Sequence, residues 1–368
     1  MNEWKEVQLG EVLEFGNGKK RPASTGLIPV YGGNGILDYT KESNYQDETI
    51  VIGRVGAYCG SVYYENKPIW LSDNAIAAKA KCNNFTKYLY YFLKNIKLNQ
   101  YALGSSHPLI TQTLLNSLEY NICINENEQK EIAEILSSLD DKIDLLNRQN
   151  KTLEQMAETL FRQWFVEEAQ DGWEEGVLDD ILSVKGGTTP STKNPDFWNG
   201  DINWTTPRDL SSDSNMYLLN TLRKITKKGL SKISSGLLSR GTLLLSSRAP
   251  VGYLAFADTP IAINQGYIAI IDNKAFSKYW IYLWLKENMN YVKSHANGST
   301  FQEISKSSFK ALKIIIPPEN KRKNFDNLIK PFFQKINKNI HQIYTLENMR
   351  DTLLPKLMNG EIEVEVNG

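Results

Sequence analysis

Two glycine-containing segments are rich in hydrogen-bond donors, which are cations in the first and small hydroxyl groups in the second. They are Gly16-Asn17-Gly18-Lys19-Lys20-Arg21 and Gly186-Gly187-Thr188-Thr189-Pro190-Ser191. Loops of this composition can lie close to a phosphate backbone, because glycine leaves room for it and the other side chains donate hydrogen bonds. Tight turns without a ligand are the alternative. The candidate contacts from these segments and from the residues that follow the second are Lys19, Lys20, Arg21, Thr188, Thr189, Ser191, Lys193 and Arg208.

Two arginines and one pair of amides offer chemistry directed at nucleobases. Arg54 and Arg248 stand beside glycine-containing turns, where a guanidinium could bind guanine or phosphate in a forked geometry. A structural ion pair is the competing interpretation for both. Asn264 and Gln265 could contact adenine edges, or could simply end a strand.

A third pair of segments repeats a Gly-Ser beginning: GSSHPLITQTLLNSL at residues 104–118 and GSTFQEISKSSFKAL at residues 298–312. Each passes from a polar stretch to a helix-like one, and hydroxyl groups at a helix N-terminus suit phosphate. Simple N-capping is the alternative. The candidates are Ser105, Ser106, His107, Ser299, Thr300 and Gln302.

These segments belong to a larger internal repeat. WKEVQLGEVLEFGNGKKRPAS from Trp4 matches WEEGVLDDILSVKGGTTPS from Trp173, and GRVGAYCGSVYY from Gly53 matches SSRAPVGYLAFA from Ser246. SDNAIAAKA from Ser72 is aligned with AINQGYIAI from Ala262. The offset between the copies grows by about 24 residues, which predicts an insertion in the second copy near residues 201–237.

Each copy predicts an α+β module of short strands with one or two helices, followed by one long helix. The expected long helices cover about residues 126–168 and 320–357. Pro331 should either kink the second helix or mark its true start. The predicted boundaries are 1–125 and 169–318 for the two modules, 126–168 and 319–358 for the helices, and 359–368 for a tail.

The long helices carry coiled-coil patterns. Apolar residues follow 4-3 spacing from Ile132 to Trp164, with Asn150 as the polar member, and a less regular seam runs from Phe332 to Leu357 through Asn339. An antiparallel pairing brings the two asparagines together, and a polar core residue fixes register at a cost in stability. The predicted layers join Leu146 with Ile343, Asn150 with Asn339, and Leu153 with Ile336.

The charge balance argues against a nucleic-acid binder, but the charge distribution does not. The chain has 42 basic and 42 acidic residues. Five lysines and no acid lie between Asn74 and Leu118, and seven Lys or Arg and no acid lie between Ser214 and Ala257. This segregation permits two positive faces on a neutral protein. An ordinary solvated surface is the alternative.

The whole chain resembles the specificity subunit of type I restriction-modification systems. The similar motifs are SVKGGTTPS, WTTPRDL, SSRAPVGY, INQGY, the GST…I…S…F…L…IP stretch and the coiled-coil helices. The first copy departs most, since GRVGAYCG replaces the Arg-Ala-Pro-like loop and only IPVYGGNG precedes it where WTTPRDL would be expected.

The resemblance implies two target-recognition domains related by a pseudo-two-fold axis and separated by an antiparallel coiled coil. Each domain would recognise one half of a bipartite sequence in double-stranded DNA, and the helices would set the spacer. It also implies binding of two methyltransferase subunits and, in some systems, motor-nuclease subunits. Methylation, cleavage and S-adenosylmethionine belong to those partners, so this chain is expected to be non-catalytic and without a cofactor of its own.

One other class of protein fits the duplicated helices equally well, and the remaining classes fit less well. A scaffold that holds two identical partners without recognising DNA would explain the duplicated helices equally well. An RNA-binding module is disfavoured because the aromatic residues lie in apolar helix-like stretches. Asn194-Pro195-Asp196-Phe197 and Glu65-Asn66-Lys67 only partly match methyltransferase and nuclease motifs. Scarce histidines and three scattered cysteines predict no metal site, and the absence of a long apolar run predicts a cytoplasmic protein.

Overall fold

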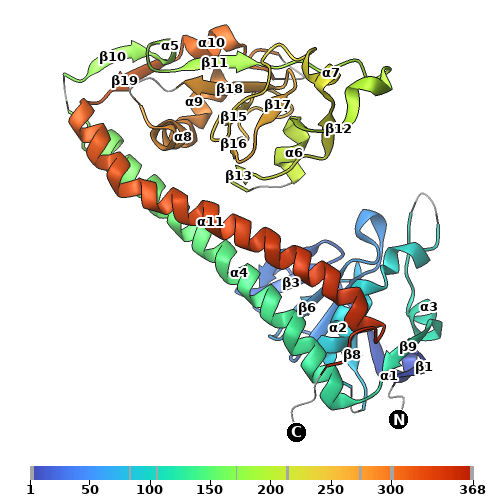
Figure 1. The fold of residues 1–368 in the computed structure, drawn as a ribbon. Helices are drawn as coiled ribbons and strands as arrows, with labels where there is room; N and C mark the ends of the chain where they lie inside the picture. The colour runs from blue at the N-terminus through green and yellow to red at the C-terminus, as the bar shows by residue number, and fades with distance from the viewer. Residues whose placement is uncertain are drawn as a thin grey trace. The chain divides into compact units, whose positions relative to one another are not determined.

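The computed structural model describes residues 4–82, 84–104, 107–170, 172–212, 215–272, 276–298 and 302–364. The chain forms two compact units, Met1–Ile143 with Thr345–Gly368, and Asp144–Tyr344. Each unit contains one α+β module and its own part of both long helices (Figure 1).

The first unit contains three small sheets. The largest has the order β2-β8-β5-β6, the next has the order β4-β3-β7, and β1 pairs with β9. All neighbouring strands are antiparallel except β3 and β7, which are parallel. The strands are β1 (Trp4–Gln8), β2 (Leu13–Asn17), β3 (Ile28–Gly32), β4 (Gly35–Thr40), β5 (Thr49–Gly53), β6 (Val62–Glu65), β7 (Trp70–Leu71), β8 (Ala75–Ala80) and β9 (Glu119–Cys123). The helices of its module are α1 (Leu9–Val12), α2 (Thr86–Asn95) and α3 (Gln112–Ser117).

The second unit repeats this plan. Its sheets have the orders β11-β18-β15-β16-β13, β14-β12-β17 and β10-β19, and β12 and β17 are parallel as β3 and β7 are. The strands are β10 (Glu174–Val177), β11 (Ser183–Gly186), β12 (Trp198–Thr205), β13 (Tyr217–Leu218), β14 (Arg223–Ile225), β15 (Leu243–Ser246), β16 (Leu254–Ala257), β17 (Ile261–Ile263), β18 (Tyr267–Asp272) and β19 (Lys313–Ile316). The helices of its module are α5 (Leu178–Ile181), α6 (Pro207–Ser212), α7 (Lys227–Leu230), α8 (Lys278–Glu287), α9 (Met289–Ser294) and α10 (Lys306–Lys310).

The extra chain of the second copy lies where the sequence placed it. Residues 33–34 alone connect β3 to β4, whereas residues 206–222, with α6 and β13, connect β12 to β14. One part of the sequence alignment was wrong. Strand pairing places Ala75 opposite Gly53 and Tyr267 opposite Ser246, so Ala75 corresponds to Tyr267 and not to Gln265.

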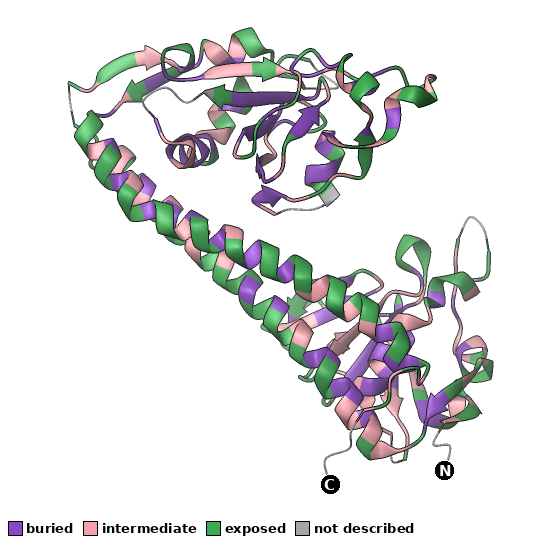
Figure 2. Ribbon diagram, viewed as in Figure 1, coloured by how far each residue is buried: buried purple, intermediate pink, exposed green. Residues whose placement is uncertain are grey.

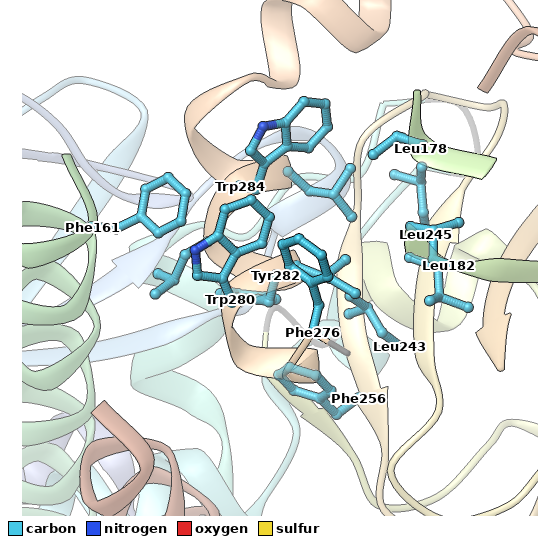
Figure 3. Close-up of a cluster of buried hydrophobic side chains, with 14 of the residues drawn as sticks. Phe161, Leu178, Leu182, Leu243, Leu245, Phe256, Phe276, Trp280, Tyr282 and Trp284 are labelled. Carbon is cyan, nitrogen blue, oxygen red and sulfur yellow. The ribbon is translucent and has the colours of Figure 1, made fainter. Parts of the chain in front are cut away.

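Each module is built around a strand that is buried along its whole length. All five residues of β5 and all four of β15 are buried, because helices or a second sheet cover both faces. Figure 3 shows α8 residues such as Trp280 packed between Phe161 of α4 and leucines of β15. The aromatic side chains of Trp280, Trp284, Tyr91 and Phe92 are all buried.

The two long helices are α4 (Glu126–Arg162), followed by one π-helical turn (Gln163–Glu167), and α11 (Glu319–Met358). Figure 2 shows a buried stripe along each of them with exposed faces beside it. The helix α11 passes through Pro331 without ending, so the expectation that this proline marks its start is wrong.

The predicted pairing of the helices is confirmed. In the second unit the Nδ2 of Asn339 donates to the Oδ1 of Asn150 at 2.8 Å. Leu146, Ile336 and Ile343 are buried beside this pair, and Leu153 is half-buried. In the first unit the Nη1 of Arg350 donates to the Oδ1 of Asp140 at 2.7 Å. Earlier residues of α4 therefore face later residues of α11, which makes the pair antiparallel.

Candidate nucleic-acid interface

Four loops of the second unit meet at one end of its sheets. The Thr189 hydroxyl donates to the Oε1 of Gln265 at 2.7 Å, which joins the glycine loop after β11 to the turn before β18. The backbone N–H of Ser247 donates to the carbonyl of Gly266 at 2.8 Å, and the N–H of Ile304 donates to the carbonyl of Ser247 at 3.0 Å. The loops that carry Thr189, Arg248, Gln265 and Gln302 thus form one surface.

The WTTPRDL segment reaches the same place. The N–H of Asn264 donates to the carbonyl of Thr205 at 3.0 Å, and a methyl group added at Gly266 would lie 2.8 Å from the ring of Pro207. The Tyr267 hydroxyl, whose pKa burial raises, donates to the carbonyl of Thr206 at 2.7 Å. Arg208 is exposed on α6, one residue beyond Pro207.

The first unit arranges its loops in the same way. The N–H of Arg54 donates to the carbonyl of Asn74 at 3.0 Å, and the N–H of Ile110 donates to the carbonyl of Arg54 at 2.9 Å. These bonds correspond to those that Ser247 makes in the second unit. Arg54 therefore corresponds to Ser247, and Arg248 corresponds to Val55, so the two arginines are not equivalent.

The glycine loops lie directly against backbone, at Ser72 just after β7 in the first unit and at Ile263 of β17 in the second. A Cβ at Gly18 would lie 1.8 Å from the carbonyl oxygen of Ser72, and one at Gly187 would lie 1.8 Å from that of Ile263. The Tyr45 hydroxyl, with a pKa raised by burial, also holds the first loop through the carbonyl of Asn17 at 3.1 Å. Glycine is required here by backbone packing, which is the tight-turn interpretation, and the packing also fixes where the neighbouring polar groups stand.

Some polar side chains of the glycine loops are bonded within the protein, and others are exposed to solvent. The Thr188 hydroxyl donates to the carbonyl of Lys232 at 2.9 Å and accepts the N–H of Ser234 at 3.1 Å, so it stabilises the loop itself. Lys19, Lys20, Ser191 and Lys193 are exposed. Arg21 forms an ion pair with Asp38.

The two base-directed arginines are in different states. The Nη1 of Arg248 lies 3.6 Å from a carboxylate oxygen of Glu303, so the ion-pair alternative holds for this residue. Arg54 is half-buried, and its guanidinium has no ion pair in the part of the chain that the structure describes. Arg54 is thus the better prepared to bind an external anion or base.

The side chains of Asn264 and Gln265 also differ in their hydrogen bonding. The Oδ1 of Asn264 accepts the N–H of Gly266 at 2.8 Å, which closes a turn at the end of β17. Gln265 is exposed, and only its carbonyl oxygen is engaged, by Thr189. The strand-end alternative therefore describes Asn264, whereas the amide nitrogen of Gln265 remains available among the described residues.

The two described candidates of the Gly-Ser segments, His107 and Gln302, do not stand at helix N-termini. The structure gives α3 the N-cap Thr111 and α10 the N-cap Ser305, each accepting a backbone N–H with its hydroxyl. His107 and Gln302 are both exposed and precede these caps by three or four residues, outside any helix or strand, so the expected helix-end position is wrong for both. The other four candidates, Ser105, Ser106, Ser299 and Thr300, lie outside the described residues.

Sequence reasoning missed two cations near the same surface. A Cβ at Gly186 would lie 3.3 Å from the Nζ of Lys306, so this lysine covers the glycine loop. The guanidinium carbon of Arg223 lies 3.5 Å from the ring centre of Trp198, and the Nε1 of Trp198 donates to the carbonyl of Ser191 at 3.1 Å. A lysine directly after a serine N-cap was the available signal for Lys306, and nothing in the sequence paired Arg223 with Trp198.

The expected positive faces are weaker than the sequence count suggests. Lys228 pairs with Asp196 at 3.2 Å, Arg240 pairs with Asp258 at 3.0 Å, and Lys79 lies 3.7 Å from Asp47. Acids from outside the acid-free stretches neutralise these cations. The exposed cations that border the loops carry the remaining charge.

The Asn194-Pro195-Asp196-Phe197 motif has a structural role. The Oδ1 of Asn194 accepts the N–H of Asp196 at 3.0 Å and caps a short 3₁₀ helix (Pro195–Phe197). Among the described residues there is no group of three His, Cys, Asp or Glu side chains that could hold a metal ion. Nor is any described helix both long and apolar enough to cross a membrane.

A family model for the type I restriction modification DNA specificity domain matches the chain twice, over residues 1–155 and 170–346. The chain belongs to this family. It therefore carries two DNA specificity domains, and each match includes one module with its loops.

Specificity subunits of type I restriction enzymes are similar to this family member along different parts of its length. The MjaIX subunit of Methanocaldococcus jannaschii is 39% identical over 181 residues, which cover 47% of this chain and 42% of that protein. The HindI subunit of Haemophilus influenzae is 26% identical over 334 residues, covering 70% and 72%. The chain thus spans less than half the length of MjaIX in that alignment.

The fold is shared with a solved structure. A type I restriction-modification S subunit from M. genitalium superimposes with a TM-score of 0.67, covering 96% of each chain at 18% identity. The expected α+β architecture with two modules and long helices is confirmed by this likeness and by the strand orders described above.

Proposed function

We propose that this chain is the DNA-recognition subunit of a type I restriction-modification complex and that each module binds one half of a bipartite target. The observation that carries the proposal is the repeated loop end. Both modules gather a glycine loop, the turn before β8 or β18, and the loop after β5 or β15 at the same end of the same sheets. The side chains on these loops differ between the modules, so the two half-sites should differ in sequence.

The long helices are proposed to set the distance between the half-sites. The helix α4 has 37 residues and α11 has 40, which corresponds to about 55–60 Å of helix. The Asn150–Asn339 bond supports a single register for the pair. The exposed faces of the two helices are proposed to bind two methyltransferase subunits, with restriction subunits added in systems that have them.

The chemistry is assigned to those partners. Methyl transfer needs S-adenosylmethionine, which the methyltransferase subunit would bind, and this chain would supply only the position on DNA. Support comes from the family match, which concerns DNA specificity. The expected result is that the chain alone has no methyltransferase or nuclease activity on duplex DNA.

Exchange of one module tests the proposal. Residues 1–125 are replaced by the corresponding module of another family member, and the methylated adenines are mapped in host DNA. One half of the target should change while the other half and the gap stay as they were. A target that is unchanged, or changed in both halves, would contradict the assignment of one half to each module.

Addition of one heptad to both helices tests whether they set the distance between the half-sites. Seven residues lengthen an α-helix by about 10 Å, so the gap between half-sites should grow by about three base pairs. The insertions follow Asn147 in α4 and precede Gln342 in α11, which lie at the same level in the register set by the Asn150–Asn339 pair. An insertion in one helix alone would misalign the seam and serves as the control. An unchanged gap between the half-sites in the double insertion would contradict this role of the helices.

A scaffold that does not recognise DNA remains the competing function. Binding of the complex to duplex DNA separates the two. Sequence preference with an affinity that falls steeply with salt supports recognition, and absent or salt-insensitive binding supports the scaffold.

A further inference from the structure

A cleft of about 440 Å³ lies in the second unit, away from the loops described above. Gly241 precedes β15 and Ala257 ends β16, whereas the loop that carries Arg248 follows the other end of β15. The remaining wall comes from the start of α8 and one face of α11. The lining residues are Tyr217, Arg240, Gly241, Ala257, Asp258, Lys278, Tyr279, Gln334, Asn337 and Lys338.

The one carboxylate of the cleft is already satisfied. Asp258 is 6% exposed, and the Arg240 guanidinium donates to both of its oxygens at 3.0–3.2 Å. The Nδ2 of Asn337 donates to its Oδ1 at 2.8 Å, and the Nε2 of His341 lies 2.6 Å from its Oδ2. The carboxylate therefore holds Arg240 and Asn337 in place and has little capacity left for a further cation.

Two lysines in the cleft have no such partner among the residues that the structure describes. Lys278 lies over the rings of Phe256 and Tyr279, at 5.4 and 5.3 Å from their centres, and a Cβ at Gly241 would be 2.8 Å from its Nζ. Burial lowers the pKa of Lys278. In the part of the chain that the structure describes, neither Lys278 nor Lys338 forms a salt bridge. Three cations and one neutralised acid leave the cleft with an excess of positive charge.

We propose that this cleft binds a phosphate group. A phosphate has several acceptor oxygens and would give Lys278 a counter-ion in direct contact, with Lys338 and Arg240 at the rim. The volume is too large for a chloride ion alone and sufficient for a phosphate monoester or one backbone phosphate.

The internal repeat limits the site to the second unit. Strand pairing aligns Leu243 of β15 with Ile50 of β5, so Asp47 and Glu48 take the places of Arg240 and Gly241 in the first unit. Glu48 is engaged there by the Tyr64 hydroxyl at 2.5 Å. The corresponding position of the first unit is acidic, and one phosphate per chain is expected.

Calorimetric titration of inorganic phosphate into the full chain tests the proposal, with chloride keeping the ionic strength constant. We expect one site, weakened roughly tenfold by Lys278→Met, which keeps the contact with the rings but removes the charge. Lys338→Met, at an exposed position, should weaken it less and guards against misfolding of the first variant. Lys335→Met, on the same helix but outside the cleft, should bind like the wild type. Equal affinity in all four proteins, or no binding, would overturn the proposal.

A second arm identifies the source of the phosphate. If the site takes a DNA backbone phosphate, saturating duplex should abolish phosphate binding, and Lys278→Met should reduce the salt slope of DNA binding by about one. If the ligand is a free phosphate compound, the DNA-bound chain should bind phosphate as before. The phosphate titrations are independent of the exchange of residues 1–125, because the cleft lies in the second unit and away from the loops proposed to contact DNA. An unchanged methylation target in that exchange would therefore not alter either titration.

Discussion

Asn339 donates from its amide nitrogen to the Oδ1 of Asn150 and to the Oε1 of Gln149, each at 2.8 Å, in a part of the helix seam where Ile336, Ile340 and Ile343 are buried. Asn339 is fully buried, and its own Oδ1 has no hydrogen-bond partner among the described residues. A buried polar group of this kind costs stability but penalises every other register, because a shifted helix would leave the amide without any partner.

Replacement of both asparagines by leucine should therefore stabilise the chain. We expect Asn339→Leu alone to lower the free energy of unfolding by about 1 kcal/mol. The double variant with Asn150→Leu should have a free energy of unfolding about 1 kcal/mol above that of the wild type. Urea unfolding measures both, with the exposed Asn147→Leu as control. A double variant less stable than either single one would contradict this view of the seam.

The different states of the two arginines predict unequal losses of DNA affinity. Arg54→Ala should weaken binding to the target by about 1–3 kcal/mol, since its guanidinium is free to bind. Arg248→Ala should cost less, because Arg248 must first leave Glu303. Glu303→Gln should release Arg248 and strengthen binding. Equilibrium binding to labelled duplex at several salt concentrations measures these effects, and equal losses for both arginines would refute the distinction.

The close approach of the glycine loops predicts strong sensitivity to one methyl group. Gly18→Ala and Gly187→Ala should each destabilise their unit by about 2–3 kcal/mol, since the new Cβ would overlap a backbone carbonyl that cannot rotate away. Gly33→Ala is the matched control, because its nearest neighbour would lie at an ordinary 3.5 Å. Thermal unfolding compares them, and similar losses for Gly18→Ala and Gly33→Ala would contradict the packing argument.

Buried tyrosines predict a loss of stability in alkali. Burial raises the pKa of Tyr88, Tyr217 and Tyr267 above the ordinary value near 10. The unfolded chain loses these protons first, so stability is fully present below about pH 10 and falls as the pH rises towards the folded pKa, by at most about 1.4 kcal/mol per pH unit for each tyrosine. Urea midpoints at rising pH should decline less steeply in Tyr88→Phe than in the control Tyr58→Phe, whose ring is exposed. Parallel declines would contradict this assignment.

Much of the fold could be predicted because its signals are local or repeated. The strand before each long helix, the 4-3 spacing and the position of the insertion all follow from residue patterns within one segment or from comparison of the two copies. The pairing of Asn150 with Asn339 could be predicted over a long separation because each helix has only one seam asparagine.

The state of individual site residues could not be predicted in the same way. The pairing of Arg248 with Glu303 and the contact of Lys306 with Gly186 depend on how separate loops converge, and no periodic pattern encodes that convergence. The N-termini of α3 and α10 were predicted at the wrong residues for a related reason. Both Gly-Ser segments contain hydroxyl groups, yet Thr111 and Ser305 are the residues that cap.

The proposed recognition of a bipartite target can be tested in a host genome. Methylated adenines are mapped with and without the chain, while the partner methyltransferase is present in both cases. We expect methylation at one bipartite sequence with a fixed gap, and loss of that methylation when the chain is removed. A continuous target sequence, or methylation that persists unchanged without the chain, would contradict the proposed recognition.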